Sequence, residues 1–375
     1  MALASRQREK QEPITILGIE SSCDETAAAV LRRDRQRTEI LSSIVATQLR
    51  EHTPYGGIVP EIAARAHTAK IDTVIRAAVD EAGINYVDLD GVAATSGPGL
   101  IGGVITGLMC AKGLALALDI PLLAVNHLEG HALSPRLTEK NYAFPNLLLL
   151  VSGGHTQLIG VHGLGDYTRI GSTVDDALGE AFDKTAKVMG LGFPGGPKVE
   201  NLAATGDAGT YDFPRPYSGT DHANFSLSGL KTAVARAFDS SDKSGQAKAD
   251  ICASFQQAVC DIIVDRIKNA IPIYRKQLKE PESSHRLVVA GGVAANQAIR
   301  SVLVDVCEQQ NFRLIVPPLK YCTDNAAMIA LAGLERFEKG QSDPLNTRAR
   351  PRWPLDEQAA KSDPVSGCGK KGAKS

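Results

Sequence analysis

Short apolar runs, joined in pairs by small polar turns, recur along this chain. The runs Ile14–Glu20 and Ala27–Leu31 predict the two strands of a hairpin, and Asn146–Val151 and Gln157–Val161 predict a second hairpin of the same kind. The two hairpins start about 130 residues apart. Their similarity indicates an internal duplication of one folding unit.

A strand, a glycine-rich turn and a helix follow one another at two further places. Gly91–Thr95 leads through Ser96–Gly103 into a helix, and Arg286–Ala290 leads through Gly291–Asn296 into another. Backbone N–H groups at such turns can approach a phosphate at a helix N-terminus. The first turn matches neither the P-loop pattern nor a strict G-x-G-x-x-G, so tight packing of helix on strand is the alternative explanation.

These patterns together predict an α/β fold of the duplicated actin-like or sugar-kinase-like (ASKHA) class, with two lobes around a nucleotide cleft. An NAD-type Rossmann fold fits less well because its glycine fingerprint and spacing are absent. We expect the following organisation: a disordered head at 1–13, an N-terminal actin-like lobe at 14–125, a metal-binding helix with the C-terminal actin-like lobe at 126–355, and a disordered tail at 356–375.

Composition limits the class of protein without identifying it. The 375 residues are 43% hydrophobic and 22% charged with a net charge of −1, so a nucleic-acid partner has to be bound by a local basic patch. Seven cysteines without a C-x-x-C pair fit a reducing compartment. The stretch Leu100–Leu118 contains glycines and Lys112, which predicts a core helix rather than a membrane span. Met1–Glu12 lacks the apolar segment of a signal peptide.

Two histidines at helical spacing are the most informative chemical feature. Asn126 follows the apolar run Leu122–Val125 and is a good helix N-cap, which places His127 and His131 one turn apart on the same helix face. One metal ion can bind both imidazoles. Leu128 occupies the position that the general-base glutamate has in H-E-x-x-H peptidases, so hydrolytic chemistry is not indicated. For an isolated H-x-x-x-H, two buried histidines with hydrogen-bond partners are the simpler explanation.

A metal site needs a third ligand, and the candidate carboxylates are Asp24, Asp175, Asp183 and Asp324. Asp324 begins a helix of small apolar residues, where an aspartate commonly acts only as an N-cap. As a ligand it would complete a set of two histidines and one carboxylate with open positions. Such a set suits iron(II) or zinc, with the open positions available to a substrate.

The segment from Lys112-Gly113 through Pro121 to His127-Leu-Glu-Gly-His131 resembles the signature of the TsaD family, the tRNA N6-adenosine threonylcarbamoyltransferases formerly called the O-sialoglycoprotein endopeptidase family. The resemblance runs in order over roughly residues 14–355, and its form at Val151-Ser-Gly-Gly-His155 and Arg350-Pro-Arg-Trp353 is that of the bacterial branch or its mitochondrial relatives. The other matching motifs are Gly18-Ile-Glu-Ser-Ser-Cys-Asp-Glu-Thr26, Gly57-Ile-Val-Pro-Glu61, Glu180-Ala-Phe-Asp-Lys184, Pro194-Gly-Gly-Pro197, Gly291-Gly-Val293 with Asn296, and Thr323-Asp324-Asn325.

This resemblance implies an actin-like fold and a specific reaction. The threonylcarbamoyl group passes from threonylcarbamoyl-AMP to the N6 amine of the adenosine next to the anticodon (position 37), in tRNAs that read codons beginning with A, and AMP leaves. The implied metal ligands are His127, His131 and Asp324, holding one divalent ion, Fe2+ in preference to Zn2+. The implied substrate contacts are Leu150, Val151, Ser152, Gly153, Gly154, Asp183, Gly196, Glu200 and Asn296.

Partners and location also follow from the resemblance. Members act on tRNA together with a degenerate paralogue and a small ATPase, without a membrane, in the cytoplasm, or in the mitochondrial matrix for a eukaryotic member. The basic segment with Arg348, Arg350, Arg352 and Trp353 is a candidate for contact with tRNA, although such a segment is often only solvated. Either His155 or the substrate phosphate is a candidate acceptor for the amine proton.

Three other functions compete with this one. A metallopeptidase would need a glutamate at Leu128. An actin-like ATPase or kinase acting on a small molecule would need a Mg2+-binding carboxylate and no histidine pair. A catalytically inactive scaffold subunit should have lost the histidine pair, which is present here.

Overall fold

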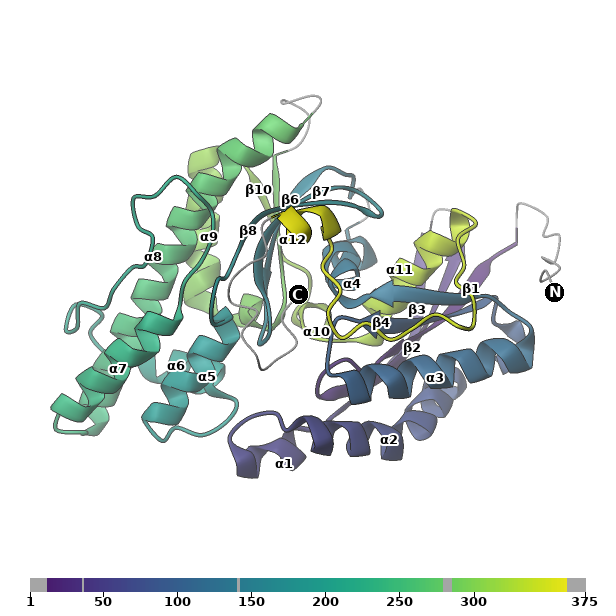
Figure 1. Ribbon diagram of the computed structural model, residues 1–375, viewed down its shortest axis with the longest axis horizontal. Coiled ribbons are helices and arrows are strands. Elements are labelled where there is room, and N and C mark those ends of the chain that lie inside the picture. Colours follow the sequence, from purple (N-terminus) through teal and green to yellow (C-terminus); the bar gives the residue numbers. More distant parts are fainter. Residues whose placement is uncertain (1–11, 36, 140–141, 279–284, 363–375) are drawn as a thin grey trace. The chain divides into compact units, whose positions relative to one another are not determined.

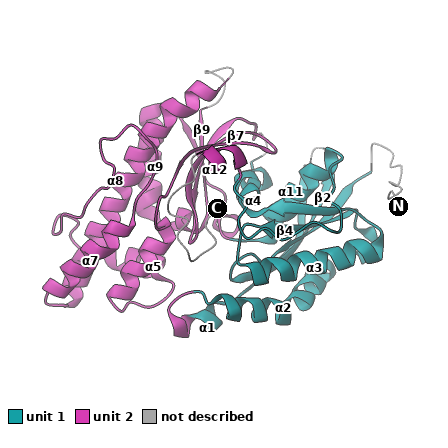
Figure 2. Ribbon diagram, viewed as in Figure 1, with its two compact units in different colours: residues 1–52, 58–140, 324–354 teal, residues 53–57, 141–323, 355–375 magenta. Residues whose placement is uncertain are grey.

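The protein consists of two compact units, each built around its own five-stranded sheet (Figures 1 and 2). The computed structural model describes residues 12–35, 37–139, 142–278 and 285–362. Unit 1 comprises residues 1–52, 58–140 and 324–354, and unit 2 comprises 53–57, 141–323 and 355–375 (Figure 2).

The sheet of unit 1 has the strand order β3-β2-β1-β4-β5. Its strands are β1 (Ile14–Glu20), β2 (Glu25–Asp34), β3 (Arg37–Thr47), β4 (Gly91–Gly97) and β5 (Leu122–Asn126). β1 pairs antiparallel with β2 in the predicted hairpin, and it pairs parallel with β4 on its other side. The carboxyl ends of the parallel strands β1, β4 and β5 therefore lie at the same edge of the sheet.

Both faces of this sheet are covered by helices. The helices of the unit are α1 (Leu49–His52), α2 (Pro60–Glu81), α3 (Ile101–Leu118), α4 (His127–Leu133) and α11 (Ala326–Glu338). Leu17 and Ile19 of β1 share a buried cluster with α2 and α3. Gly18 lies between them on the strand and faces α11, because side chains alternate across a sheet. A Cβ at Gly18 would lie 2.4 Å from the carbonyl oxygen of Ala326, so only glycine allows this close approach of helix and strand.

The sheet of unit 2 repeats the same connectivity. Its strand order is β10-β9-β6-β7-β8, with β6 (Asn146–Val151), β7 (Thr156–Gly163), β8 (Asp166–Ser172), β9 (Arg286–Ala290) and β10 (Arg313–Ile315). β6 pairs antiparallel with β7 and parallel with β9, just as β1 pairs with β2 and β4. The five strands of one unit thus correspond in order and direction to the five of the other. The predicted duplicated α/β fold is confirmed.

A larger helical layer completes unit 2. Its helices are α5 (Leu178–Val188), α6 (Gly195–Ala203), α7 (Ser228–Ser240), α8 (Gly245–Gln277), α9 (Gln297–Gln310), α10 (Leu319–Cys322) and α12 (Glu357–Ser362), with short 3-10 turns such as η4 (Gly292–Ala295). The β6 residues Leu147, Leu149 and Val151 form one buried cluster with side chains of α5, α8 and α9. This core holds the turn after β6 and the start of α6 in place.

The division of the chain differs from the predicted lobes at 14–125 and 126–355. Helix α4, the predicted metal-binding helix, and the distant helix α11 both belong to unit 1, since α11 packs on β1 and β4 through Gly18 and Gly333. The predicted disorder of 356–375 is wrong for Glu357–Ser362, which form α12, and the remainder of that tail lies outside the described residues. Most of the predicted head, residues 1–11, also lies outside them.

One helix among the described residues, α3, is long and apolar enough to cross a membrane, but a core helix passes the same test. The helix buries one face, with Val104 and Leu108, against the sheet. Its other face exposes Met109 and Leu116, the latter 70% accessible. The predicted core helix is therefore correct for one face only.

Candidate metal centre and nucleotide pocket

The two histidines of α4 lie together, as their spacing predicts. Asn126 is the N-cap of the helix: its side-chain oxygen accepts a hydrogen bond of 2.9 Å from the backbone N–H of Leu128. The imidazole rings of His127 and His131 have centroids 4.7 Å apart and are nearly perpendicular. Both side chains are buried, with 7% and 1% of their surface accessible.

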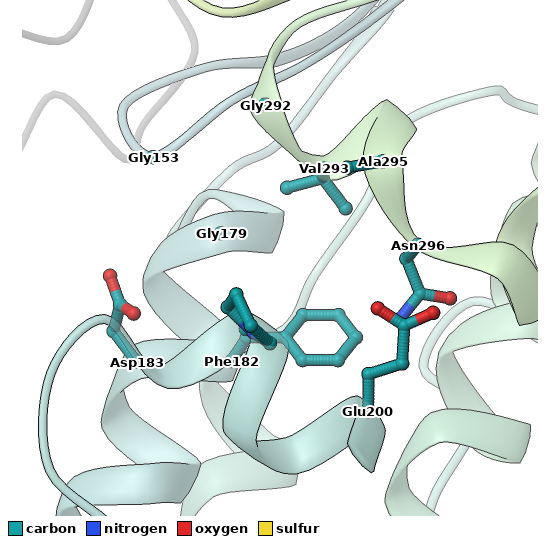
Figure 3. Close-up of a pocket in the computed structure, with 11 residues that line it drawn as sticks. Gly153, Gly179, Phe182, Asp183, Glu200, Gly292, Val293, Ala295 and Asn296 are labelled. Carbon is teal, nitrogen blue, oxygen red and sulfur yellow. The ribbon is translucent and has the colours of Figure 1, made fainter. Parts of the chain in front are cut away.

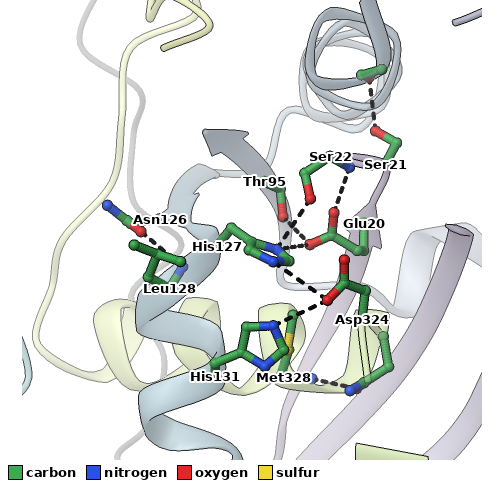
Figure 4. Close-up of polar contacts among 12 residues, drawn as sticks. Glu20, Ser21, Ser22, Thr95, Asn126, His127, Leu128, His131, Asp324 and Met328 are labelled. Carbon is green, nitrogen blue, oxygen red and sulfur yellow. Dashed lines mark hydrogen bonds and ion pairs between the residues drawn. The ribbon is translucent and has the colours of Figure 1, made fainter. Parts of the chain in front are cut away.

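Asp324 lies beside the two histidines, although it is 193 residues beyond His131 in the sequence. The N-cap of α11 is Asn325, which accepts a hydrogen bond from the N–H of Met328, so the Asp324 carboxylate has no capping role. Its Oδ1 lies 3.1 Å from Nε2 of His131 and 3.5 Å from Nε2 of His127 (Figure 4). Within the described part of the chain, this is a group of three metal-binding side chains whose ligand atoms all lie within 4.8 Å of one another.

The spacing of these atoms fits a first-row divalent metal. Bonds of about 2.1 Å at tetrahedral angles separate two ligand atoms by roughly 3.4 Å. The distances of 3.1 and 3.5 Å from Asp324 Oδ1 to the two Nε2 atoms bracket that value. Two imidazoles and one carboxylate form a donor set that suits iron(II) or zinc and leaves coordination positions open for a substrate.

Opposite charges stabilise this cluster when no metal is bound. Burial alone would lower the pKa of His127, but the carboxylates of Glu20 and Asp324 outweigh it and raise that pKa well above its ordinary value. Burial alone would raise the pKa of Asp324, but His127 and His131 hold it well below its usual range. The two carboxylates therefore favour the protonated, positively charged form of His127. A divalent cation would replace the proton that supplies this charge.

The acidic residue of α4, Glu129, is paired with an arginine of α11. Glu129 is buried, and its Oε1 accepts a hydrogen bond of 2.6 Å from Nε of Arg336 on α11. This ion pair ties α4 to α11 and fixes the two elements that bring the three ligands together. A carboxylate held in this way does not serve as a general base beside the histidines.

A pocket of about 180 Å3 lies within unit 2 (Figure 3). Glycine backbone at Gly153, Gly179 and Gly292 forms part of its wall, and Phe182 and Val293 supply apolar surface. Its polar side chains are Asp183, Glu200 and Asn296. A concave site with apolar walls and a few polar groups is typical of a small-molecule pocket.

The polar groups of the pocket are fixed by backbone contacts. Oδ1 of Asp183 accepts a hydrogen bond of 2.7 Å from the N–H of Gly195, and Oε1 of Glu200 accepts one of 2.6 Å from the N–H of Gln297. Asn296 is the N-cap of α9, accepts from the N–H of Ile299 and donates to the side chain of Gln256. Because these side chains are held by the starts of helices α6 and α9, the pocket is preformed.

Comparison with known proteins identifies the family. The model of one family, described as TsaD: tRNA N6-adenosine threonylcarbamoyltransferase, matches residues 39–331. A curated relative of that name from Maricaulis maris is 56% identical over 363 residues, which cover 96% of each chain. Another from Agrobacterium fabrum is 54% identical over 364 residues, covering 96% of this chain and 99% of the relative. The chain belongs to the TsaD family.

Solved structures support the fold of this TsaD chain. The structure of HypF from T. kodakarensis has a TM-score of 0.56 at 16% identity, over 88% of this chain and 49% of that one. Full-length HypF in a phosphate- and nucleotide-bound form has a TM-score of 0.53 at 13% identity, over 89% and 48%. At this identity the likeness concerns the fold alone, which is the duplicated actin-like class that the sequence predicts.

Some of the predicted substrate contacts of this TsaD chain line the pocket and others do not. Those that line it are Gly153, Asp183, Gly196, Glu200 and Asn296. Leu150 and Val151 are completely buried in β6, where their side chains form the sheet core. Ser152 holds the turn: its hydroxyl accepts from the N–H of His155, and its carbonyl accepts from the N–H of Gly179. Gly154 follows in the same turn and is not among the lining residues.

Two other candidate ligands of the metal have different positions. Asp175 caps the start of α7: its carboxylate accepts hydrogen bonds from the N–H of Leu227 and from the hydroxyls of Ser226 and Ser228. Asp24 lies in the turn after β1, and it is not part of the group of ligand atoms around Asp324. Of the four candidate carboxylates, the structure brings only Asp324 to the histidines among the described residues.

The glycine loop after β4 is not open to a phosphate. The carbonyl oxygen of Ser96 accepts from the N–H of Arg350, and the N–H of Gly99 donates to the carbonyl of Pro351. The loop is therefore tightly packed, and the backbone of Arg350 and Pro351 is its packing partner. The neighbouring Arg348 and Arg352 are exposed, whereas the Arg350 guanidinium stacks 4.5 Å from the centre of the Trp353 ring.

Sequence reasoning missed Glu20 at the candidate metal site and six residues that line the pocket: Gly179, Phe182, Pro197, Gly292, Val293 and Ala295. Glu20, at the end of β1, places its Oε2 2.9 Å from Nδ1 of His127, and a glutamate that ends a largely apolar strand was the available signal (Figure 4). Phe182 forms a wall of the pocket and packs edge-on against Phe255 with ring centres 5.1 Å apart. Its helical pattern is that of any core aromatic residue, so the sequence carried no sign of this role.

Proposed function

We propose that this chain transfers a threonylcarbamoyl group from threonylcarbamoyl-AMP to the N6 amine of the adenosine at position 37 of tRNA. The amine nitrogen forms a bond to the carbamoyl carbon, the bond from that carbon to the phosphate oxygen breaks, and AMP leaves with its phosphate while the amine loses a proton. Membership of the TsaD family over nearly the whole chain supports this activity. The observation that carries it is the convergence of His127, His131 and Asp324 on one point.

The ligand set of this reaction is His127, His131 and Asp324, with Fe2+ preferred and Zn2+ as the alternative. When bound, the ion supplies Lewis-acid polarisation of an oxygen at its open position. The burial of His127 and His131 and the pairing of Glu129 with Arg336 keep the side chains in a fixed arrangement. Leu128, which is apolar and completely buried, stands where an H-E-x-x-H peptidase has its general-base glutamate, so a peptidase function is not supported.

The pocket of unit 2 is the proposed site of the adenylate. Gly153, which lines the pocket, can present its backbone N–H to the phosphate, whereas the N–H of Ser152 donates to the carbonyl of His155. Asp183 and Glu200 can accept hydrogen bonds from ribose or adenine donors, and Asn296 can contribute its amide. Phe182 adds apolar lining of the kind that small-molecule pockets use.

Removal of one metal ligand tests the function. His131→Ala should abolish transfer from threonylcarbamoyl-AMP to unmodified tRNA, and metal analysis should show loss of the ion. His162→Ala is the matched control, since this imidazole lies in β7 of unit 2, half-buried and bonded to Thr168. Full modification by His131→Ala refutes the role of the metal. Metal-independent turnover of ATP by both variants would instead favour a kinase-like function.

The proposed partners are tRNA, a degenerate paralogue and a small ATPase, and the proposed location is the cytoplasm. A large exposed apolar surface on a helix is typical of a protein–protein interface, and α3 exposes Ile105, Met109 and Leu116. The test compares the tRNA-modifying activity of the purified chain alone with that after addition of each bacterial partner. Equal activity without partners would contradict the requirement for a complex.

A further inference from the structure

A buried glutamate stands directly behind one of the two histidines. Glu20 is the last residue of β1 and is completely buried. Its Oε2 lies 2.9 Å from Nδ1 of His127, while Nε2 of the same ring faces Asp324 at 3.5 Å (Figure 4). We propose that Glu20 is a positioning residue that orients His127 and fixes its tautomer for metal binding. The proposal rests on the metal site of the proposed function and adds a residue to it.

Glu20 is itself held on both oxygens. The hydroxyl of Thr95, on the neighbouring parallel strand β4, donates to Oε2 at 2.6 Å, and the backbone N–H of Ser22 donates to Oε1 at 2.6 Å. These contacts come from two different elements of unit 1. The carboxylate therefore cannot rotate away from His127, and it acts as a rigid support rather than as a mobile base.

The position of this carboxylate decides which ring nitrogen of His127 can bind a metal. An ionised carboxylate only accepts hydrogen bonds, so it keeps the proton on Nδ1 and leaves the lone pair of Nε2 directed at the metal position. Ligating histidines are commonly supported in this way, and loss of the support lowers metal affinity about 10–100-fold. With a divalent ion bound, the charges of Glu20 and Asp324 would also balance it inside a buried site.

Glu20 is not itself part of the ligand group. The three ligand atoms within 4.8 Å of one another come from His127, His131 and Asp324, and the carboxylate of Glu20 faces the far side of the His127 ring. The other histidine has no equivalent support among the described residues, because Nδ1 of His131 is buried without a hydrogen-bond partner there. The two imidazoles of the site are therefore inequivalent, and only one of them depends on Glu20.

The decisive variant is Glu20→Gln. The N–H of Ser22 requires an acceptor, so the glutamine oxygen should stay at Ser22 and its NH2 group should face Nδ1 of His127. The amide would then donate to Nδ1 and move the ring proton to Nε2, the atom that has to bind the metal. Glutamine has almost the same shape as glutamate. If Glu20 acted only through packing, the substitution should therefore have little effect on metal affinity.

The test titrates the metal-free full-length chain with Co2+, whose visible absorption reports coordination, and with Zn2+ against a chromophoric chelator. Glu20→Gln should bind both ions about 10–100-fold more weakly than the wild type. Asp90→Asn is the matched control: this carboxylate accepts from the N–H of Thr15 near the other end of β1, so its neutralisation should leave metal affinity unchanged. Unfolding of the metal-free variants, followed by fluorescence of Trp353, separates a metal effect from a loss of stability.

Each outcome has one meaning. Binding of Co2+ by Glu20→Gln with the affinity and spectrum of the wild type overturns the role of Glu20 and leaves the proposed function standing. Absence of binding by the wild type overturns the metal site and this proposal with it. If Glu20→Gln does not fold, Glu20→Asp keeps the charge but shortens the side chain by one methylene and so withdraws the carboxylate from Nδ1 of His127. An unchanged Zn2+ affinity in that variant likewise overturns the proposal.

Discussion

Replacement of Gly18 by alanine should disturb the proposed metal centre, because it changes how helix α11 packs on β1. An added Cβ would lie 2.4 Å from the carbonyl oxygen of Ala326 and 2.5 Å from the backbone nitrogen of Ala330, and the first distance is 1.0 Å short of ordinary contact at 3.4 Å. Both atoms are backbone, so α11 has to move by about 1 Å. Asp324 directly precedes the N-cap of that helix and should move with it, whereas metal ligands tolerate about 0.2 Å.

The expected cost is about 1–3 kcal/mol of unfolding free energy, the usual range for overpacking a core, together with a loss of Zn2+ affinity of about tenfold or more. Trp353 is the only tryptophan of the chain and belongs to unit 1, so its fluorescence during denaturation reports this unit. Zn2+ titration of the metal-free chain then measures the effect on the site.

The same substitution at Gly113 provides a control with the opposite sign. Gly113 lies within α3, is exposed, and an added Cβ there would meet nothing within 4 Å. Alanine in a helix is favoured over glycine by about 0.5–1 kcal/mol, so Gly113→Ala should stabilise unit 1 slightly and leave Zn2+ binding unchanged. Wild-type stability and Zn2+ affinity in Gly18→Ala would refute the described contact between α11 and β1.

Three further predictions concern the pocket, a helix cap and the tRNA surface. Gly196→Leu should fill open space at the pocket wall and weaken AMP binding in calorimetry about tenfold without changing the unfolding midpoint; unchanged binding would place the nucleotide elsewhere. Asp175→Asn should cost about 0.5–2 kcal/mol near neutral pH. Burial raises the pKa of Asp175, but hydrogen bonds from Leu227, Ser226 and Ser228 lower it overall. The stabilisation by the Asp175 carboxylate is therefore present above the unfolded pKa of 3.8 and is lost as the pH falls through the folded pKa. A difference in unfolding free energy between Asp175→Asn and the wild type that persists in acid would contradict the cap. Arg348→Ala with Arg352→Ala should weaken tRNA binding and reduce its salt dependence by about one ion per lost phosphate contact, and an unchanged salt slope would exclude this segment.

The sequence predicted those elements whose signal is local. The hairpin of β1 and β2 and the N-cap at Asn126 follow from apolar runs and a capping residue that lie side by side in the chain. The same holds for the histidine pair, because one turn of helix brings positions 127 and 131 together whatever the remainder of the fold does.

The sequence alone could not predict which elements far apart in the chain pack against each other. Nothing in the pattern of α11 places it on β1 rather than in the second half of the chain, because that assignment depends on the absence of a side chain at Gly18. Asp324 was selected by family resemblance, and its nearness to His131 requires this tertiary contact. The shift of the N-cap from Asp324 to Asn325 is a matter of one residue, which patterns of polarity do not resolve.

The duplicated topology explains why both candidate sites form where they do. In unit 1 the functional groups follow the carboxyl ends of parallel strands: Glu20 ends β1, Thr95 lies near the end of β4, and His127 comes directly after β5. In unit 2 the corresponding strands are β6 and β9, and the turns that follow them supply Gly153 and Gly292 of the pocket. Backbone and side chains at that edge are not covered by further strand pairing, so each copy of the fold offers the same place for a ligand. In unit 1 this place holds the proposed metal ligand His127, and in unit 2 glycine backbone lines an open pocket.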